Sequence, residues 1–463
     1  MINSSSSAFV HNLNTILNLQ GTNLTVDAEG LLQAKVGNLP VEPSPGFFTT
    51  LFGTGSNRIE QVVNETCTRL FEEIINKNKA PLVSTCAALT NDRITAGKIL
   101  DRLELLGNVI LNPQLKADLK ELVDIPETLE ARLALRQGIT PEVLNKTSSG
   151  TYIMRNRQGK PWGIFKPQCQ EIGGSKNPSW VIWAVCTSEQ WGIEEGTGYL
   201  RECAAYSLDK NHFSNVPLTV STHFQHPALD TSIFPISTPN LTGSFQLFKD
   251  NCKPGNECLK KYEIYSVKLG KAAGGSVLYS MIKKAYVTFF RFLFFCGLPH
   301  LPVNQVHRMA ILDIRLLNCD RHFGNFLFDK ISQKLFPIDH GLILPANATK
   351  TRFDWKQLIQ SHIPFSNEEL AYIDQLNADE DEKILIKCGI NCLEALGRMK
   401  LSTALLKECA KRGMTAHQIA DLMVGKRITV NGNYFEDVIC KEVFKKGLNR
   451  DVVIRQAISD YLG

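Results

Sequence analysis

Three side chains suited to phosphoryl transfer lie close together in the segment from Ile311 to Gly341. Asp320 and Asn325 are five positions apart on a predicted short loop, and Asp339 opens an Asp-x-Gly turn fourteen residues later. Phosphoryl transfer needs an aspartate that orients or deprotonates the attacking hydroxyl. It also needs an asparagine and a second aspartate that hold magnesium ions on the nucleotide phosphates. The joint spacing therefore indicates a phosphoryl-transfer site rather than ordinary loop carboxylates.

A predicted hairpin separates the asparagine from the second aspartate of this set. Its strands are expected at Phe326 to Phe328 and at Lys334 to Ile338. Because the residues before and after a hairpin return to the same edge, the two side chains can meet around one metal ion. Arg321 and His322 directly follow the first aspartate, and we expect them to neutralise charge on the transferred phosphoryl group.

The residues that precede this loop have a β-rich pattern. Two alternating runs, Thr151 to Arg155 and Trp162 to Lys166, flank the polar turn Asn156 to Gly159 and predict a β-hairpin. Phe245 to Phe248 predicts a further strand, and Gly198 to Leu208 has the periodicity of a helix. Since the later residues are mainly helical in pattern, we expect a small β-rich lobe followed by a larger helical lobe.

The segment around Asp320 closely resembles the catalytic and activation loops of the phosphatidylinositol 3- and 4-kinase superfamily. The resemblance rests on the runs HRMAILDIRLLNCDRHFGNFLF and PIDHGLILP, and it is nearest to the plant gamma-type branch of the type II phosphatidylinositol 4-kinases. It extends from about Ser148 to Met423 and implies an α+β, two-lobed protein-kinase-like fold that uses ATP and Mg²⁺. It also implies that Asp320 is the catalytic aspartate, with Asn325 and Asp339 as metal ligands.

The same resemblance implies where the nucleotide binds. Lys166, in the run GIFKP, matches the ATP-binding lysine, and Glu202 on the predicted helix is placed to pair with it. The turn that starts at Ser148 resembles the phosphate-covering turn, and Gly243 to Phe248 resembles the hinge whose backbone binds adenine. The residues expected at the nucleotide are Ser148, Ser149, Gly150, Thr151, Lys166, Glu202, Gln246, Leu247, Phe248 and Lys249.

A second likeness concerns membranes. The run Asn177 to Trp183 resembles the segment of animal type II enzymes that leads into a palmitoylated cysteine cluster, but only Cys186 stands near the place of that cluster. One acyl chain gives only marginal, reversible attachment, so membrane binding would rely on interfacial tryptophans. We expect Trp180, Trp183 and Trp355 to serve at such an interface, with burial in the core as the alternative.

Composition limits the class of protein and its partners. The chain has 463 residues, of which 43% are hydrophobic and 21% charged, as in a folded globular protein. The net charge of +5 is too small over this length to imply a nucleic-acid partner. The 13 cysteines form no CxxC pair, so we expect reduced thiols without disulfide partners. We therefore expect a cytoplasmic protein that is peripheral on the cytosolic face of membranes.

The pattern along the chain predicts four parts. Residues 1–145 are expected to form a helical region of unknown role, either an accessory region or a docking region whose partner is an unidentified protein. Residues 146–250 are expected to form the nucleotide-binding lobe and residues 251–425 the catalytic lobe. Residues 426–463 are expected to form a helical tail.

The function expected from these features is ATP-dependent phosphorylation of phosphatidylinositol at the inositol 4-hydroxyl, which yields phosphatidylinositol 4-phosphate. Two alternatives remain at this stage. A protein Ser/Thr kinase would use the same catalytic parts on a different acceptor. A nucleotide- or lipid-binding scaffold would have lost turnover, although the four chemical positions Lys166, Asp320, Asn325 and Asp339 are intact.

Overall fold

In the computed structural model, the chain divides into two compact units. One unit comprises Met1–Ile139 together with residues 155–160, and the other comprises Thr140–Met154 and Pro161–Gly463. The structure describes residues 22–26, 32–36, 39–41, 126–144, 148–174, 176–177, 192–229, 240–259, 301–346, 351–424 and 435–462.

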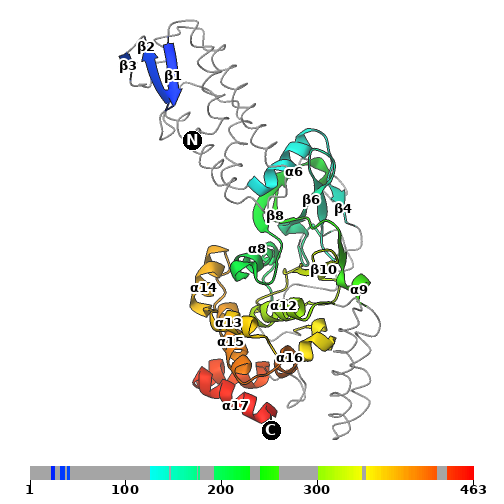
Figure 1. Cartoon of the computed structure of the whole chain (residues 1–463), viewed down its shortest axis with the longest axis vertical. Coiled ribbons are helices and arrows are strands. Elements are labelled where there is room, and N and C mark those ends of the chain that lie inside the picture. Colours follow the sequence, from blue (N-terminus) through cyan, green and yellow to red (C-terminus); the bar gives the residue numbers. More distant parts are fainter. Residues whose placement is uncertain are drawn as a thin grey trace. The chain divides into compact units, whose positions relative to one another are not determined.

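The first unit contains a small sheet that the sequence analysis did not anticipate. Strands β1 (Thr22–Val26), β2 (Leu32–Val36) and β3 (Leu39–Val41) pair antiparallel in that order (Figure 1). Helix α6 (Pro126–Arg136) belongs to the same unit. The expectation that residues 1–145 are helical is therefore wrong for their first part, and the helices expected between residues 59 and 123 lie outside the described residues.

The β-rich lobe of the second unit is a five-stranded sheet with the order β4-β5-β6-β8-β7 (Figure 1). Strands β6 and β8 run antiparallel, as do β8 and β7. The strands are β4 (Glu142–Val143), β5 (Tyr152–Arg155), β6 (Pro161–Pro167), β7 (Thr219–Gln225) and β8 (Asn240–Leu247). The predicted hairpin is confirmed as β5 and β6, whereas β7 was missed because its polar residues alternate on an edge strand.

Aromatic side chains fill the interior of this sheet. The ring centroids of Phe165 and Phe224 lie 4.9 Å apart, and those of Phe224 and Phe245 lie 5.8 Å apart. A Cβ atom at Gly163 would come within 2.1 Å of the Phe245 ring, so only glycine leaves room for it. Helix α8 (Gly198–Leu208), which the sequence predicted, packs on β7 and β8 and thereby lies beside the strand that carries the expected ATP-binding lysine.

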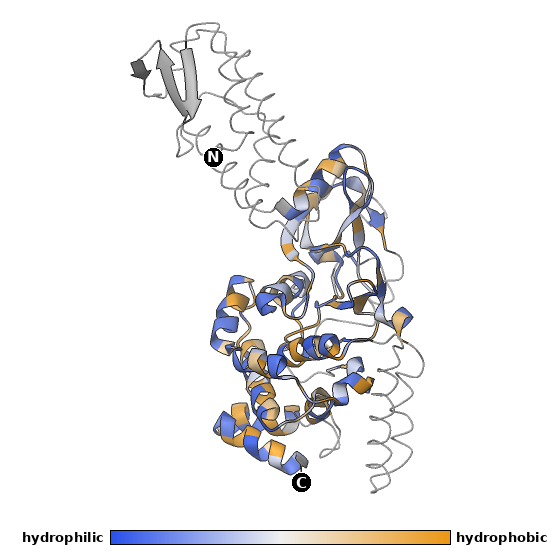
Figure 2. Ribbon diagram, viewed as in Figure 1, coloured by the Kyte–Doolittle hydropathy of each residue, from blue (hydrophilic) through white to orange (hydrophobic). Residues whose placement is uncertain are grey.

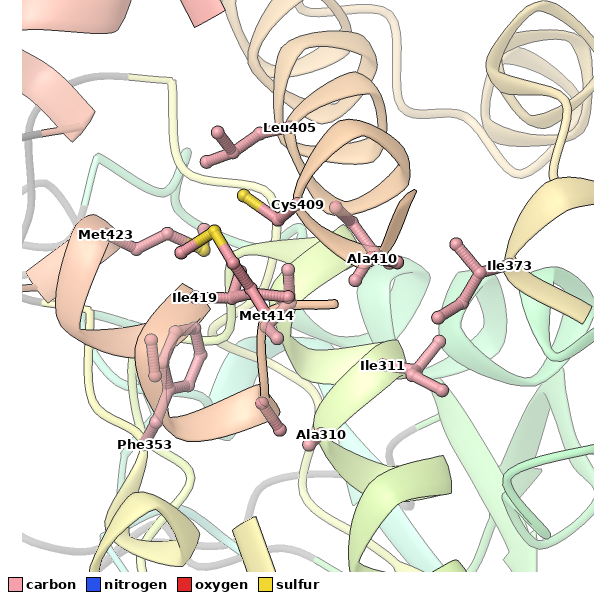
Figure 3. Close-up of a cluster of buried hydrophobic side chains, with 14 of the residues drawn as sticks. Ala310, Ile311, Phe353, Ile373, Leu405, Cys409, Ala410, Met414, Ile419 and Met423 are labelled. Atoms are coloured by element: carbon pink, nitrogen blue, oxygen red, sulfur yellow. The ribbon is translucent and has the colours of Figure 1, made fainter. Parts of the chain in front are cut away.

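The larger lobe is built around helix α12 (Val303–Leu316), which is buried along nearly its whole length. The helices of this lobe carry both hydrophobic and hydrophilic residues, as amphipathic helices around a shared core do (Figure 2). Buried side chains from α12 and its neighbours, among them Ile311, Leu405 and Ile419, meet in one cluster (Figure 3). The other helices are α13 (Asn367–Asp374), α14 (Ala378–Lys387), α15 (Leu393–Lys411), α16 (Ala416–Val424), the π-helical segment η9 (Phe435–Lys445) and α17 (Arg450–Leu462).

A three-stranded sheet completes this lobe. Strand β10 (Phe326–Asp329) pairs antiparallel with β11 (Lys334–Pro337) on one side and with β9 (Cys252–Pro254) on the other. The hairpin expected between the asparagine and the second aspartate is thus confirmed. A β-rich lobe followed by a helical lobe is also the α+β, kinase-like architecture that the sequence predicted.

The expected membrane role of one tryptophan is wrong. Trp355 is fully buried, and its indole Nε1–H donates a hydrogen bond to Asp313 Oδ2 at 3.0 Å. Its ring also stacks on that of Phe353, with centroids 5.1 Å apart. Trp180, Trp183 and Cys186 lie outside the described residues. Among the helices that the structure describes, none combines the length and the hydrophobicity needed to cross a membrane.

Burial of the indole makes a stability prediction. Trp355→Ala should lower the free energy of unfolding by about 3–5 kcal/mol, because it leaves a cavity beside the core of the larger lobe. Chemical denaturation of the full chain measures this loss. Ile331→Ala is a matched control, since Ile331 is 85% exposed and its truncation should leave the midpoint unchanged. A wild-type midpoint for Trp355→Ala would contradict the burial.

Candidate active site

A cleft of about 620 Å³, open in part to solvent, gathers many of the predicted site residues. The lining residues come from the turn before β5, from β6 and the loop after it, from α8 and the residues before it, from β8, and from the loops on either side of the β10–β11 hairpin. Six predicted positions are among them: Ser148, Ser149, Lys166, Glu202, Asp320 and Asp339. The residues that the sequence analysis missed are Glu171, Ile172, Ile193, Glu194, Gly198, Tyr199, Ser244, Gly341 and Leu342.

An ion-paired lysine lies at the centre of the cleft. Lys166 Nζ is 2.5 Å from Glu202 Oε1 on α8 and 3.0 Å from Asp339 Oδ1 after β11. Burial opposes the charge on Lys166, but the two carboxylates outweigh it and raise the pKa of the ammonium above its ordinary value. Glu202 is held in turn by the backbone N–H of His340, which donates to Oε2 at 2.9 Å. Three separate segments thus converge on one positive charge.

Asp339 has a left-handed backbone conformation and a carboxylate that is exposed in the cleft. Its φ of 58° lies in the left-handed region, which aspartate tolerates better than most residues. The side chain is 53% exposed. Burial opposes its ionisation, but the charge of Lys166 prevails and holds the pKa of Asp339 below its ordinary value. The side chain therefore stays anionic at neutral pH, as a ligand of Mg²⁺ must.

Asp320 is held by its main chain, and its carboxyl group reaches the cleft. Its N–H donates to Asn318 Oδ1 at 2.9 Å, and its carbonyl oxygen accepts from Asn325 Nδ2 at 2.8 Å. Burial raises the pKa of the Asp320 carboxyl, an effect that His322 opposes and Asp339 reinforces. A raised pKa brings a carboxylate nearer to the range of an effective general base.

The oxygen atoms that Asp339 and Asn325 could offer are of the types that suit a magnesium ion. Asn325 is buried and does not line the cleft, and its amide nitrogen donates to the carbonyl oxygen of Asp320 at 2.8 Å, so its side-chain oxygen is the atom that it could offer as a neutral ligand. Mg²⁺ prefers oxygen ligands and is commonly bound by one or two protein groups together with nucleotide phosphates. Among the described residues, no group of three or more His, Cys, Asp or Glu side chains could hold a metal ion by itself.

Arg321 does not face the cleft as expected. Its guanidinium is buried: Nε donates to Asp313 Oδ2 at 2.9 Å, and Nη1 donates to the carbonyl oxygens of Asn325 and Ile338. Nη2 lies 3.0 Å from His340 Nε2. These partners occupy the group that was expected to neutralise the transferred phosphoryl group. Arg321 instead joins the catalytic loop to the segment that carries Asp339.

His322 lies beside Asp320. Its Nε2 lies 3.8 Å from Asp320 Oδ2, and its Nδ1 accepts the N–H of Gly324 at 3.0 Å. Because Nδ1 is an acceptor, the proton of a neutral imidazole is on Nε2, toward the carboxylate. His322 does not line the cleft itself, so its expected role at the transferred phosphoryl group stays a prediction.

The turn that precedes β5 is fixed at the mouth of the cleft. The N–H of Gly150 donates to the carbonyl oxygen of Gln170 at 2.9 Å. A Cβ atom at Gly150 would lie 1.9 Å from Gln170 Oε1, so the close approach requires glycine. Ser148 and Ser149 line the cleft, whereas Thr151 is buried behind them.

The predicted hinge is placed differently from the expectation. The N–H of Phe248 donates to the carbonyl oxygen of Trp162 at 3.0 Å, and that of Leu247 donates to Leu218 at 2.9 Å. The N–H of Phe248 is thus bound within the protein, so a backbone bond from Phe248 to adenine would have to use its carbonyl oxygen. Gln246 bonds to Thr219 through its side chain. Lys249 Nζ lies 4.8 Å from the centroid of the Phe336 ring. None of Gln246, Leu247, Phe248 and Lys249 lines the cleft, although Ser244, earlier in the same segment, does.

Burial of Arg321 beside Asp313 predicts that its replacement lowers the free energy of unfolding by an amount that depends on pH. Arg321→Met should cost about 3–5 kcal/mol at neutral pH, because Asp313 is left buried without its cation. Burial already raises the pKa of Asp313 with the arginine present, and loss of the cation raises it further. The deficit should therefore shrink as the pH falls from about 8 to about 5 and Asp313 takes up a proton.

Denaturation of the variant across this range measures the effect. Arg321→Met combined with Asp313→Asn should recover part of the stability at neutral pH, since no unpaired charge remains. An equal deficit at both ends of the range would show that the pair is not a buried ion pair.

Comparison with known proteins agrees with this geometry. The family model for phosphatidylinositol 3- and 4-kinase matches residues 147–419. Phosphatidylinositol 4-kinase gamma 5 of Arabidopsis thaliana is 32% identical over 69% of this chain and 46% of its own length. Gamma 2 of the same plant is 29% identical over 73% and 58%, and gamma 4 of Oryza sativa subsp. japonica is 29% identical over 70% and 49%.

The chain thus spans about half the length of these curated relatives. The family model covers more than half of the chain, and its limits enclose the cleft from Ser148 to Leu342. The resemblance on the catalytic-loop runs is confirmed, and the chain belongs to the phosphatidylinositol 3- and 4-kinase family.

Proposed function

We propose that the chain transfers the γ-phosphoryl group of ATP to the inositol 4-hydroxyl of phosphatidylinositol. The observation that carries the proposal is the cleft in which Lys166, paired with Glu202 and Asp339, shares one cavity with Asp320. A paired lysine, a metal-binding aspartate and a loop aspartate are the parts that phosphoryl transfer requires. The names of the curated relatives support phosphatidylinositol as the acceptor.

Each residue has a defined task in this mechanism. Lys166 binds the nucleotide phosphates with an ammonium group that its two carboxylate partners keep charged. Asp320 orients the acceptor hydroxyl and takes up its proton as the hydroxyl oxygen bonds to the γ-phosphorus of ATP, while the bond from that phosphorus to the bridging oxygen breaks and ADP leaves. Asp339 and Asn325 would hold Mg²⁺, which neutralises charge on the phosphates when bound. His322 adds a hydrogen-bond donor beside the reacting oxygens.

A lipid acceptor implies that the cleft works at a membrane surface, so the proposal includes peripheral membrane association. The discriminating experiment offers the full chain three acceptors: phosphatidylinositol vesicles, vesicles without phosphatidylinositol, and a generic protein substrate. Phosphatidylinositol 4-phosphate, identified by chromatography against the 3- and 5-phosphate isomers, is the expected product. Labelled protein with unlabelled lipid would favour the Ser/Thr kinase alternative, and labelling of neither acceptor would favour the inactive scaffold.

The catalytic aspartate makes the first kinetic prediction. Asp320→Asn should lower the turnover number about 10²–10⁴-fold, because general-base assistance is lost while the loop keeps its main-chain bonds. Turnover on phosphatidylinositol vesicles and the melting temperature are measured together. Asp374→Asn, an exposed aspartate on α13, is the matched control and should leave both unchanged. Near wild-type turnover of Asp320→Asn would remove this residue from its role.

The metal-binding aspartate makes a binding prediction. Asp339→Asn should weaken the binding of Mg-ATP and raise the magnesium concentration needed for turnover, because a neutral amide replaces an anionic ligand. Calorimetric titration with ATP at several magnesium concentrations measures both effects. If affinity and magnesium requirement both stay at the wild-type values, Asp339 is only a turn residue.

A further inference from the structure

Glu171, which the sequence analysis did not single out, contacts the start of helix α8. It lies on the wall of the cleft, five residues after Lys166. Its Oε2 accepts the N–H of Gly198 at 2.9 Å, and its Oε1 accepts the N–H of Tyr199 at 2.6 Å. Both carboxylate oxygens are therefore bound to the first two residues of the helix.

Helix α8 has no N-terminal cap of its own. The hydroxyl of Thr197, at the N-cap position, donates to the carbonyl oxygen of Glu194 at 2.6 Å and accepts from the side-chain Nε of Arg201 at 3.2 Å, but it caps no backbone N–H of the helix. The first turn of α8 contains no acidic residue. Since the first N–H groups of a helix lack internal partners and carry its positive dipole end, an anionic acceptor there is stabilising. Glu171 supplies that acceptor from another segment.

The loop that carries Glu171 is itself anchored to the mouth of the cleft. Asn177 Nδ2 donates to the carbonyl oxygen of Glu171 at 2.8 Å and to that of Ser148 at 3.0 Å. The N–H of Gly174 also donates to the Glu171 carbonyl oxygen, at 2.9 Å. One short loop thus connects the phosphate-covering turn with the start of α8, and Glu202 follows one helical turn after Gly198.

The contact leaves no space for a side chain on the helix. A Cβ atom at Gly198 would come within 2.8 Å of Glu171 Oε2. Glycine is otherwise a poor residue for a helix compared with alanine. The glycine at this position therefore permits the close approach of the carboxylate rather than favouring the helix.

The charges around Glu171 make its ionisation sensitive to pH near neutrality. Burial raises the pKa of Glu171 to about 7, against the two backbone N–H groups that favour the carboxylate. The negative charge of Glu202 raises the pKa further, and the positive charge of Lys166 lowers it. Tyr199 and Arg201 on α8 also face this carboxylate.

We propose that Glu171 is a positioning residue for phosphoryl transfer, which holds α8 so that Glu202 keeps Lys166 at the nucleotide phosphates. The inference rests on the proposed function. Glu171 touches neither reactant in this role, because both of its oxygens are bound to the helix. Glu171 acts on the phosphates indirectly, through its hydrogen bond to the start of α8 and through the ion pair of Glu202 with Lys166.

A mutant cycle between Glu171 and Gly198 tests the contact. Glu171→Ala should lower the turnover number about tenfold or more, the scale of a lost hydrogen bond to a charged group. Gly198→Ala should also lower turnover, because its methyl group displaces the carboxylate, although alanine favours the helix and should not lower the melting temperature. In the Glu171→Ala background, Gly198→Ala should cause no further loss, since the clash is gone.

A control variant and a purely structural role of Glu171 would each give a result different from the losses of turnover expected above. Glu195→Ala removes an exposed carboxylate near the same helix and should leave turnover unchanged. If Glu171 only stabilised the fold, Gly198→Ala would leave turnover intact and the losses would follow the melting temperature. That outcome would overturn the proposal.

Two further readouts separate this inference from the proposed function. Wild-type turnover should rise between about pH 6 and pH 8 as Glu171 loses its proton, and Glu171→Gln should lack this limb. Hydrogen exchange at the start of α8 should be faster in Glu171→Ala, whether or not the protein turns over. A wild type that phosphorylates no acceptor would refute the proposed function alone, whereas unchanged exchange and an unchanged pH limb would refute the role of Glu171.

Discussion

The ammonium group of Lys166 is the interaction on which the arrangement of the cleft depends. It lies between Glu202 and Asp339, which belong to a helix of the β-rich lobe and to the loop after β11. Two carboxylates facing the same cavity would repel each other without this cation, and the cation would be costly to bury without them. The charges of Lys166, Glu202 and Asp339 are therefore balanced only when β6, α8 and the Asp339 turn are all in place. The site accordingly forms only when both lobes are correctly packed.

A second ion pair, between Asp313 and Arg321, is buried inside the larger lobe and holds the loop that carries Asp320 in place. Asp313, near the end of α12, accepts hydrogen bonds from Arg321, Asn318 and Trp355. Arg321 extends the network to the carbonyl oxygens on both sides of the β10–β11 hairpin. The loop that presents Asp320 is thus positioned by charge and hydrogen bonding inside the larger lobe, whereas its carboxyl group remains accessible.

The sequence predicted structure correctly where the geometry depends on residues that are close together in the chain. The Asp320, Asn325 and Asp339 set depends on a loop and a hairpin whose geometry follows from a few neighbouring residues, and the hairpin formed as expected. The lysine and the helix glutamate followed from resemblance and are paired in the structure.

The failures concern contacts between distant segments. Arg321 has the residue type of a phosphate ligand, but its partner Asp313 lies on a buried helix that spacing alone does not identify. Trp355 was assigned to a membrane surface because amphipathic rings suit both interface and core. The role of Glu171 depends on a helix start 27 residues later in the chain. Because threonine is an ordinary N-cap residue, Thr197 at the start of α8 gives no sign in the sequence that the cap comes from a distant carboxylate.

The three hydrogen-bond donors to Asp313 also determine how the site is lost when the protein unfolds. Arg321, Asn318 and Trp355 belong to the loop that follows α12 and to the segment after β11, and Trp355 is part of the main core cluster. Opening the catalytic loop would break a buried ion pair and expose part of that core in the same event. The loop is therefore expected to belong to the most slowly exchanging cooperative unit of the larger lobe, in contrast to ordinary surface loops. Catalytic competence and global unfolding of that lobe should accordingly be lost at the same denaturant concentration.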